Sequence, residues 1–203
     1  MRGRVDPPQM YVVGGPSGSG KSILFPPDRF GVDFFYVDWR AAELHGSPQG
    51  IPPEVRRKAG QECESFIESH ILDRKSFATE TTLRTKVALS QATRARANGF
   101  QTTLIYVSTD DPDVNVSRVT ARGLAGGHCA PEPEIRAIYA ASLRNLPAAV
   151  RVFDRVECFD TTPHGTRPSQ VATFAAGELS RVACARPTWI NELLRCCDQT
   201  TPL

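Results

Sequence analysis

Hydrophobic and polar positions along the chain follow two periods, which alternate between residues 10 and 160. Short runs rich in β-branched and aromatic residues predict strands, at residues 10–13, 32–37, 76–80, 102–107 and 155–160. Between them, apolar residues recur every third or fourth position, which predicts helices, at residues 39–44, 53–73, 84–97, 112–122 and 132–146. Asp110 or Asp111 followed by Pro112 is a typical helix start.

Strands that alternate with helices predict an α/β fold of three layers, with a mostly parallel five-stranded sheet. Right-handed crossovers bring the carboxyl ends of such strands to one edge, where ligands bind. After residue 160 the pattern weakens, and it predicts a loop at 165–169, a short strand at 179–184 and a helix at 188–196. We expect an N-terminal tail at residues 1–9 and a single domain at 10–203, whose last part is poorly defined.

Composition excludes several classes of partner. The chain has 203 residues, 40% of them hydrophobic, and a net charge of +2, which gives no electrostatic case for nucleic acid or membrane surfaces. No apolar run approaches the length of a membrane span, and the first residues lack a signal-peptide core. The six cysteines show no C-x-x-C spacing, which indicates reduced thiols. We therefore expect a cytoplasmic protein that binds neither nucleic acid nor membrane.

One segment points to specific chemistry. The pattern G-x-x-x-x-G-K-[ST] is matched at every fixed position by the phosphate loop (Gly15, Pro16, Ser17, Gly18, Ser19, Gly20, Lys21 and Ser22). A strand precedes it, and the residues after it allow one or two helical turns before two prolines. Its backbone N–H groups can cradle a triphosphate, Lys21 can reach the β- and γ-phosphates, and Ser22 can hold Mg²⁺. ATP and Mg²⁺ are the predicted cofactors.

Two carboxylates end the strands that should flank this loop. Asp38 follows the second strand and is either a general base for a hydroxyl or the N-cap of the helix that starts at Trp39. Glu80 ends the third strand and could hold Mg²⁺ through water, grip an acceptor hydroxyl, or simply be a surface acid on an edge strand.

Basic residues later in the chain could act on the phosphates. Arg118 and Arg122 are four residues apart and share a helical face, which either clamps the γ-phosphate or is solvated. His128 follows two glycines and belongs either to a lid over the nucleotide or to an ordinary exposed loop.

Three further motifs complete a recognisable pattern. They are residues 76–84 (SFATETTLR), Gly126-Gly127-His128, and the helical set Ile135, Arg136, Tyr139, Ser142, Leu143, Asn145 and Leu146. With the phosphate loop, they resemble the zeta-toxin family of P-loop kinases, and more closely its short bacterial zeta toxin-like ATPase branch. The resemblance covers about residues 10–160.

This resemblance implies a kinase that uses ATP to phosphorylate the 3′-hydroxyl of the sugar in UDP-N-acetylglucosamine, with an antitoxin-like inhibitor as a partner. Lys21 and Ser22 fall on the family's nucleotide and Mg²⁺ positions, and Asp38 falls on its catalytic base. The remaining matches are the E-x-T-x-R segment that contacts the sugar nucleotide (Glu80, Thr82 and Arg84) and an arginine at the transferred phosphate (Arg118, with Arg122 beside it).

The chain departs from the family where the acceptor binds. His128 stands near the position of a second phosphate-clamping arginine, and Val37-Asp38-Trp39 replaces the usual context of the catalytic aspartate. A P-loop kinase with a UDP-sugar acceptor is the leading hypothesis. There are three alternatives. The first is a kinase for another small molecule, and the second is a nucleotide-dependent switch that needs no base at Asp38. The weakest is a nucleic-acid-processing enzyme.

Overall fold

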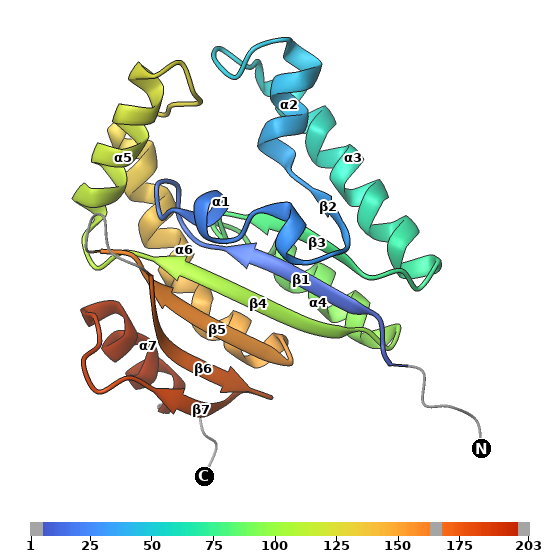
Figure 1. Cartoon of the computed structure of the whole chain (residues 1–203), viewed down its shortest axis with the longest axis vertical. Helices are drawn as coiled ribbons and strands as arrows, with labels where there is room; N and C mark the ends of the chain where they lie inside the picture. The colour runs from blue at the N-terminus through green and yellow to red at the C-terminus, as the bar shows by residue number, and fades with distance from the viewer. Residues whose placement is uncertain (1–5, 163–167, 199–203) are drawn as a thin grey trace.

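The structure is a computed structural model that describes residues 6–162 and 168–198 (Figure 1). Its strands are β1 (Gln9–Gly14), β2 (Asp33–Phe35), β3 (Phe77–Thr81), β4 (Gln101–Ser108), β5 (Arg155–Asp160), β6 (Ser169–Ala175) and β7 (Glu178–Val182). Its helices are α1 (Lys21–Leu24), the 3₁₀ turn η1 (Pro27–Arg29), α2 (Val37–His45), α3 (Pro53–Leu72), α4 (Val87–Ala97), α5 (Pro112–Leu124), α6 (Glu132–Val152) and α7 (Thr188–Asp198). The predicted tail at residues 1–9 and loop at 165–169 lie partly outside the described residues.

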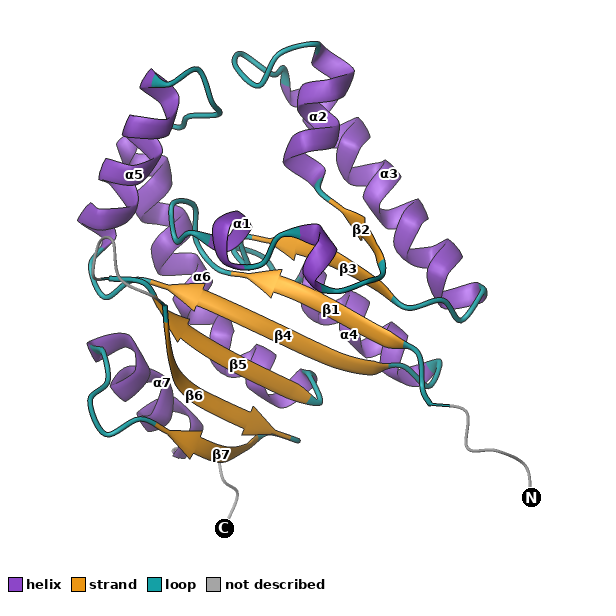
Figure 2. Cartoon of the chain, in the orientation of Figure 1, coloured by secondary structure: helices purple, strands orange, loops and turns teal. Residues whose placement is uncertain are grey.

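The described strands form a seven-stranded mixed sheet in the order β2-β3-β1-β4-β5-β6-β7 (Figure 2). The strands from β2 to β5 pair in parallel, and β6 and β7 pair antiparallel. The predicted α/β fold with a mostly parallel sheet is confirmed. The prediction of five strands is wrong, because a hairpin of β6 and β7 extends the sheet beyond β5.

The missed strand β6 lacks the usual sequence signal. Its residues 171–174 are all buried, so hydrophobic and polar positions do not alternate along it. Residues 165–169 were expected to be a loop, yet Ser169 already begins this strand. The hairpin turns at Ala176 and Gly177, whose φ values of 50° and 84° are the left-handed pair of a tight two-residue turn.

The two faces of the sheet carry separate cores. Leu104 and Tyr106 face the main core, which α4, α6 and α7 cover on one side of the sheet (Figure 1). The alternate residues Ile105 and Val107 point the other way, into a smaller cluster that includes Phe25 just after α1. None of the described helices is long and apolar enough to span a bilayer.

Two predicted helix boundaries are corrected. The helix expected from Arg84 begins at Val87, because Leu83 is buried with a left-handed φ of 56° and turns the chain before the helix starts. Helix α6 was expected to end near residue 146, but it continues through Pro147 to Val152, since apolar positions in its last turns still pack on the main core.

Two aspartates at the carboxyl ends of β4 and β5, Asp110 and Asp160, hold the first turn of the C-terminal helix α7. Asp110 accepts hydrogen bonds from the Trp189 backbone N–H at 3.2 Å and from the Thr188 hydroxyl at 3.1 Å. Asp160 accepts one from the Trp189 indole N–H at 3.2 Å. Asp110 therefore acts as an N-terminal cap for a helix that lies far away in sequence.

We expect Asp110→Ala to lower the free energy of unfolding by about 1–2 kcal/mol, because the first turn of α7 loses its acceptor. Urea denaturation followed by tryptophan fluorescence measures this change, since Trp189 reports on the helix directly. The control is Asp73→Ala, at an exposed residue after α3. Equal stability of the two variants would contradict the capping role.

Candidate active site

The phosphate loop leaves β1 and packs tightly against β4 and α5. A Cβ atom on Gly15 would lie 2.0 Å from the Val107 carbonyl oxygen, and one on Gly18 would lie 2.5 Å from the Asn115 carbonyl oxygen. Both positions therefore require glycine. Gly20 meets no atom within 4 Å, but its φ of 88° lies in the left-handed region that glycine adopts without strain.

Lys21 and Glu80 meet at the mouth of this loop. The Lys21 Nζ atom donates to the carbonyl oxygens of Gly15 at 2.8 Å and Pro16 at 3.1 Å, and it lies 3.6 Å from Glu80 Oε1. The Ser22 hydroxyl donates to Glu80 Oε2 at 3.3 Å. One carboxylate thus connects the two residues predicted to contact the phosphates and Mg²⁺.

The loop has the free groups that a triphosphate needs. The backbone N–H groups of Gly18, Gly20, Lys21 and Ser22 have no protein acceptor within residues 6–162 and 168–198. In the same part of the chain, the buried Ser19 hydroxyl also has no partner. Buried or clustered donors without acceptors are unfavourable unless a ligand supplies them, and phosphate oxygens are suitable acceptors. The residues present therefore fit a bound nucleotide.

Mg²⁺ would have oxygen ligands here from Ser22 and Glu80, with the remaining positions filled by phosphates and water. Among the described residues, no group of three or more His, Cys, Asp or Glu side chains could hold a metal ion.

A second layer of polar residues supports the loop from behind. The Asn115 side chain donates to the Ser17 carbonyl oxygen at 2.6 Å, and the Thr161 hydroxyl donates to that of Ser19 at 2.9 Å. Both residues are buried. They fix the loop from α5 and from the end of β5, respectively.

Arg118 belongs to this support. Its guanidinium donates to the Thr161 carbonyl oxygen at 2.6 Å, to the Thr161 hydroxyl at 3.1 Å and to the Gly18 carbonyl oxygen at 3.4 Å. Burial lowers the pKa of Arg118, and the nearby Asp160 carboxylate opposes that effect. In this structure the Arg118 guanidinium contacts the backbone of the phosphate loop and Thr161.

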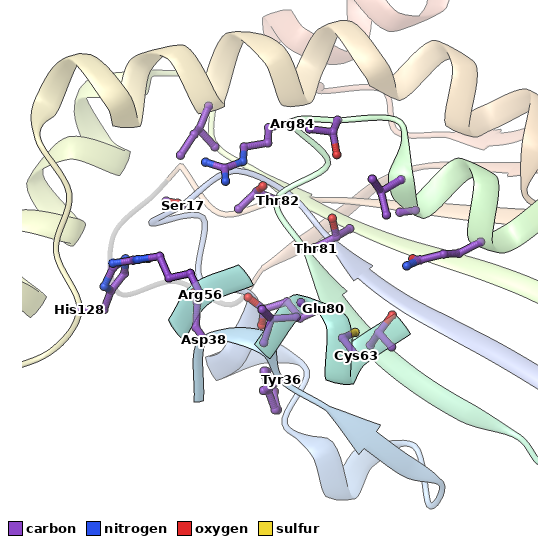
Figure 3. Close-up of a pocket in the computed structure, with 18 of the residues that line it drawn as sticks. Ser17, Tyr36, Asp38, Arg56, Cys63, Glu80, Thr81, Thr82, Arg84 and His128 are labelled. Atoms are coloured by element: carbon purple, nitrogen blue, oxygen red, sulfur yellow. The ribbon is translucent and has the colours of Figure 1, made fainter. Parts of the chain in front are cut away.

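A cavity of about 330 Å³ opens beside the loop, between β3, α2, α3 and α6 (Figure 3). The residues predicted to contact the acceptor all line it, together with one residue of the phosphate loop: Asp38, Glu80, Thr82, Arg84, His128 and Ser17. Figure 3 shows Thr82 and Arg84 on one side, Asp38 and Glu80 on another, and His128 apart from both. The Arg84 Nη1 atom lies 3.8 Å from Oε1 of Glu134, another residue of the cavity wall.

Asp38 reaches the cavity from a helix, not from a strand end. Strand β2 stops at Phe35, and α2 begins at Val37, so the expected strand 32–37 and helix start at Trp39 are both corrected. The N-cap position belongs to Tyr36, so Asp38 is not the cap. It sits in the first helical turn, and in the described part of the chain no hydrogen bond or ion pair engages its carboxylate.

Arg122 lies on the same helix as Arg118, but its side chain contacts the turn that follows this helix. Its Nε atom donates to the His128 carbonyl oxygen at 3.0 Å. A Cβ atom on Gly127 would lie 2.8 Å from the Arg122 side chain. Arg122 therefore holds the turn that carries His128 to the cavity.

Sequence reasoning missed several residues of the site. Asn115 and Thr161 support the loop, and Tyr36 and Arg56 line the cavity. Asn115 had a usable signal, because it lies three residues before Arg118 and therefore on the same face of the same predicted helix. Thr161 had none, since its contacts span 142 residues of sequence.

The chain is similar in structure to a chain of a toxin–antitoxin system and to a chain of the AvrRxo1-ORF1:-ORF2 complex. A chain of the PezAT chromosomal toxin–antitoxin system of Streptococcus pneumoniae matches with a TM-score of 0.59 at 20% identity, over 98% of this chain and 88% of that one. A chain of the AvrRxo1-ORF1:-ORF2 structure with ATP matches with a TM-score of 0.66 at 13% identity, over 97% of this chain and 65% of that one.

In sequence, an uncharacterized protein of Haemophilus influenzae is 27% identical over 125 residues, which are 62% of this chain and 88% of that protein. No protein-family model matches the chain. The structural likenesses show that the chain shares the α/β fold of these proteins.

Proposed function

We propose that this protein is an ATP-dependent kinase that transfers the γ-phosphate to a hydroxyl group of a small molecule. One observation carries the proposal. Glu80, which lines the acceptor cavity together with Asp38, lies 3.6 Å from Lys21 of the phosphate loop. Donor and acceptor sites therefore adjoin, as in-line transfer between two bound molecules requires.

Bound ATP and Mg²⁺ would supply the transferable phosphoryl group and neutralise part of its charge. The residues of this chain would then have separate tasks. The phosphate loop binds the nucleotide, and Lys21 leaves its loop carbonyls to meet the β- and γ-phosphates. Asp38 accepts the proton of the acceptor hydroxyl while the oxygen of that hydroxyl forms a bond to the γ-phosphorus. The bond between the γ-phosphorus and the bridging oxygen of the β-phosphate breaks in the same step. Arg118 is assigned a positioning role, because it holds Gly18 and Thr161.

A sugar nucleotide such as UDP-N-acetylglucosamine is the leading acceptor. The support is the resemblance of the E-x-T-x-R segment to that of the zeta toxins, together with a cavity wall rich in hydroxyls and guanidinium groups. Threonines at 79, 81, 82 and 85 suit sugar hydroxyls, and Arg56 and Arg84 suit a diphosphate. The two structural neighbours come from paired systems, which supports an inhibitor protein as a partner. We place the protein in the cytoplasm, where ATP is available.

The test is to incubate the protein with ATP·Mg²⁺ and a panel of UDP-sugars, and to measure ADP release and the phosphorylated product by mass spectrometry. We expect phosphorylated UDP-N-acetylglucosamine from wild type. With Lys21→Ala the rate should fall at least about a thousandfold, because charge stabilisation at the transferred group is lost. Lys75→Ala, at an exposed lysine beyond α3, is the control.

Product formed equally by wild type and Lys21→Ala would exclude this site as the source of the activity. ADP release without any phosphorylated sugar would favour a kinase for another acceptor, or an ATP-driven switch.

A further inference from the structure

Three aromatic rings stack in a row where β2 leads into α2, and the middle ring belongs to Tyr36, which lines the cavity. Phe34 and Tyr36 stack with ring centroids 4.2 Å apart and an interplanar angle of 20°. Tyr36 and Trp39 stack at 4.3 Å and 26°. The Tyr36 ring is therefore held on both faces, and its orientation is fixed before any ligand arrives.

The far end of this ring carries an unused polar group. Only 8% of Tyr36 is exposed, and its hydroxyl is buried without a hydrogen-bond partner in residues 6–162 and 168–198. Buried tyrosine hydroxyls usually have a partner, because an unpaired one costs free energy. The residue lines the cavity beside Asp38 and Glu80 (Figure 3), so a molecule bound there can supply the missing partner.

The surroundings decide which hydrogen-bonding role the hydroxyl can take. Burial, followed by the nearby Glu80 and Asp28 carboxylates, raises the pKa of Tyr36 to about 12. The group therefore keeps its proton and can donate. Glu80 is already engaged by Lys21 and Ser22, and it makes no hydrogen bond to Tyr36 in this structure.

We propose that Tyr36 is an acceptor-binding residue whose hydroxyl donates a hydrogen bond to an oxygen of the molecule to be phosphorylated, and so selects an oxygen-rich acceptor and holds it against Asp38. This inference rests on the proposed kinase function. The role differs from that of Asp38, because Tyr36 orients the acceptor and does not exchange protons with it. A bound acceptor that lacks the matching oxygen would leave the hydroxyl unpaired, which is how such a site discriminates.

Tyr36→Phe tests the inference, because it removes one oxygen and keeps both stacked rings. The variant should unfold at the same temperature as wild type or at a higher one, since an unpaired buried hydroxyl is lost. Its KM for the sugar nucleotide should rise at least about tenfold, with a smaller change in kcat. Tyr11→Phe is the matched control, since Tyr11 packs on Phe30 outside the residues that line the cavity and should keep the wild-type KM.

A lower unfolding temperature for Tyr36→Phe would show that the hydroxyl has a structural partner and would overturn the proposal. So would an unchanged KM for the sugar nucleotide. If wild type binds ATP but phosphorylates no acceptor in the panel, the proposed function fails and this inference falls with it. If wild type phosphorylates the sugar and Tyr36→Phe does so with the same KM, only this inference fails.

Discussion

Replacing Asp38 with asparagine should lower the rate of acceptor phosphorylation by about 10²- to 10⁴-fold while the protein still binds ATP. Asparagine keeps the shape of the side chain but cannot accept the proton of the attacking hydroxyl. Asp38 lines the cavity beside Glu80 and has no partner in the described residues that would occupy its carboxylate. Single-turnover measurements with excess enzyme isolate the chemical step, and calorimetric titration with a non-hydrolysable ATP analogue measures the affinity.

The control for this change is Asp28→Asn. Asp28 is exposed, and its carboxylate contributes to the raised pKa of Tyr36, but it is not among the residues that line the cavity. Its rate should stay within about twofold of wild type, because surface charges at this distance are screened. Equal single-turnover rates for Asp38→Asn and wild type would remove Asp38 as the base and would favour a nucleotide-dependent switch.

Gly15→Ala should abolish measurable ATP binding and destabilise the protein by about 3 kcal/mol or more. The new methyl group would lie 2.0 Å from the Val107 carbonyl oxygen, in a backbone with a φ of 139°. Since the Val107 backbone belongs to the central strand β4, it cannot move aside without disturbing the sheet, and the loop must shift instead. Urea denaturation gives the loss of stability, and titration with ATP gives the loss of binding.

Gly46→Ala separates the effect of the clash from that of the backbone conformation. Gly46 has a φ of 81° at the C-terminus of α2, and no atom lies within 4 Å of its Cβ position. This variant should lose only about 1–2 kcal/mol, the ordinary cost of a left-handed alanine, and should keep its affinity for ATP. A Gly15→Ala variant as stable as Gly46→Ala would contradict the close packing of the loop on β4.

Features with local causes were predictable from the sequence. The phosphate loop, the strand before it and the cap at Asp111 depend on neighbouring residues, and the structure has all three, with Asp111 accepting from the Asp113 N–H. The predicted α/β fold with a mostly parallel sheet is confirmed for the same reason, because alternating strands and helices leave few arrangements. Of the residues predicted to contact the acceptor, Glu80 and Thr82 reach the cavity because β3 ends there, at the edge where parallel strands meet.

Features that depend on distant contacts were not predictable. Helical spacing places Arg118 and Arg122 on one face, but it cannot show that one contacts Thr161 and the other the His128 carbonyl. From the sequence, Tyr36 looks like an ordinary strand residue, because its stacking between Phe34 and Trp39 and its buried, unpartnered hydroxyl are visible only in the structure. Strand β6 was missed since burial on both faces removes its alternation.

The attachment of α7 has a consequence for how much chain the site needs. Every residue of the motifs discussed above lies before residue 161, so a fragment ending at β5 would contain all the recognisable chemistry. That fragment would lack Thr188 and Trp189, leaving the carboxylates of Asp110 and Asp160 without those donors, beside the residues that support the phosphate loop. The fragment would also lose Thr161, which donates to the Ser19 carbonyl oxygen and accepts from Arg118, so the phosphate loop would lose part of its support. The minimal motif and the minimal working protein therefore differ by the length of the C-terminal hairpin and helix.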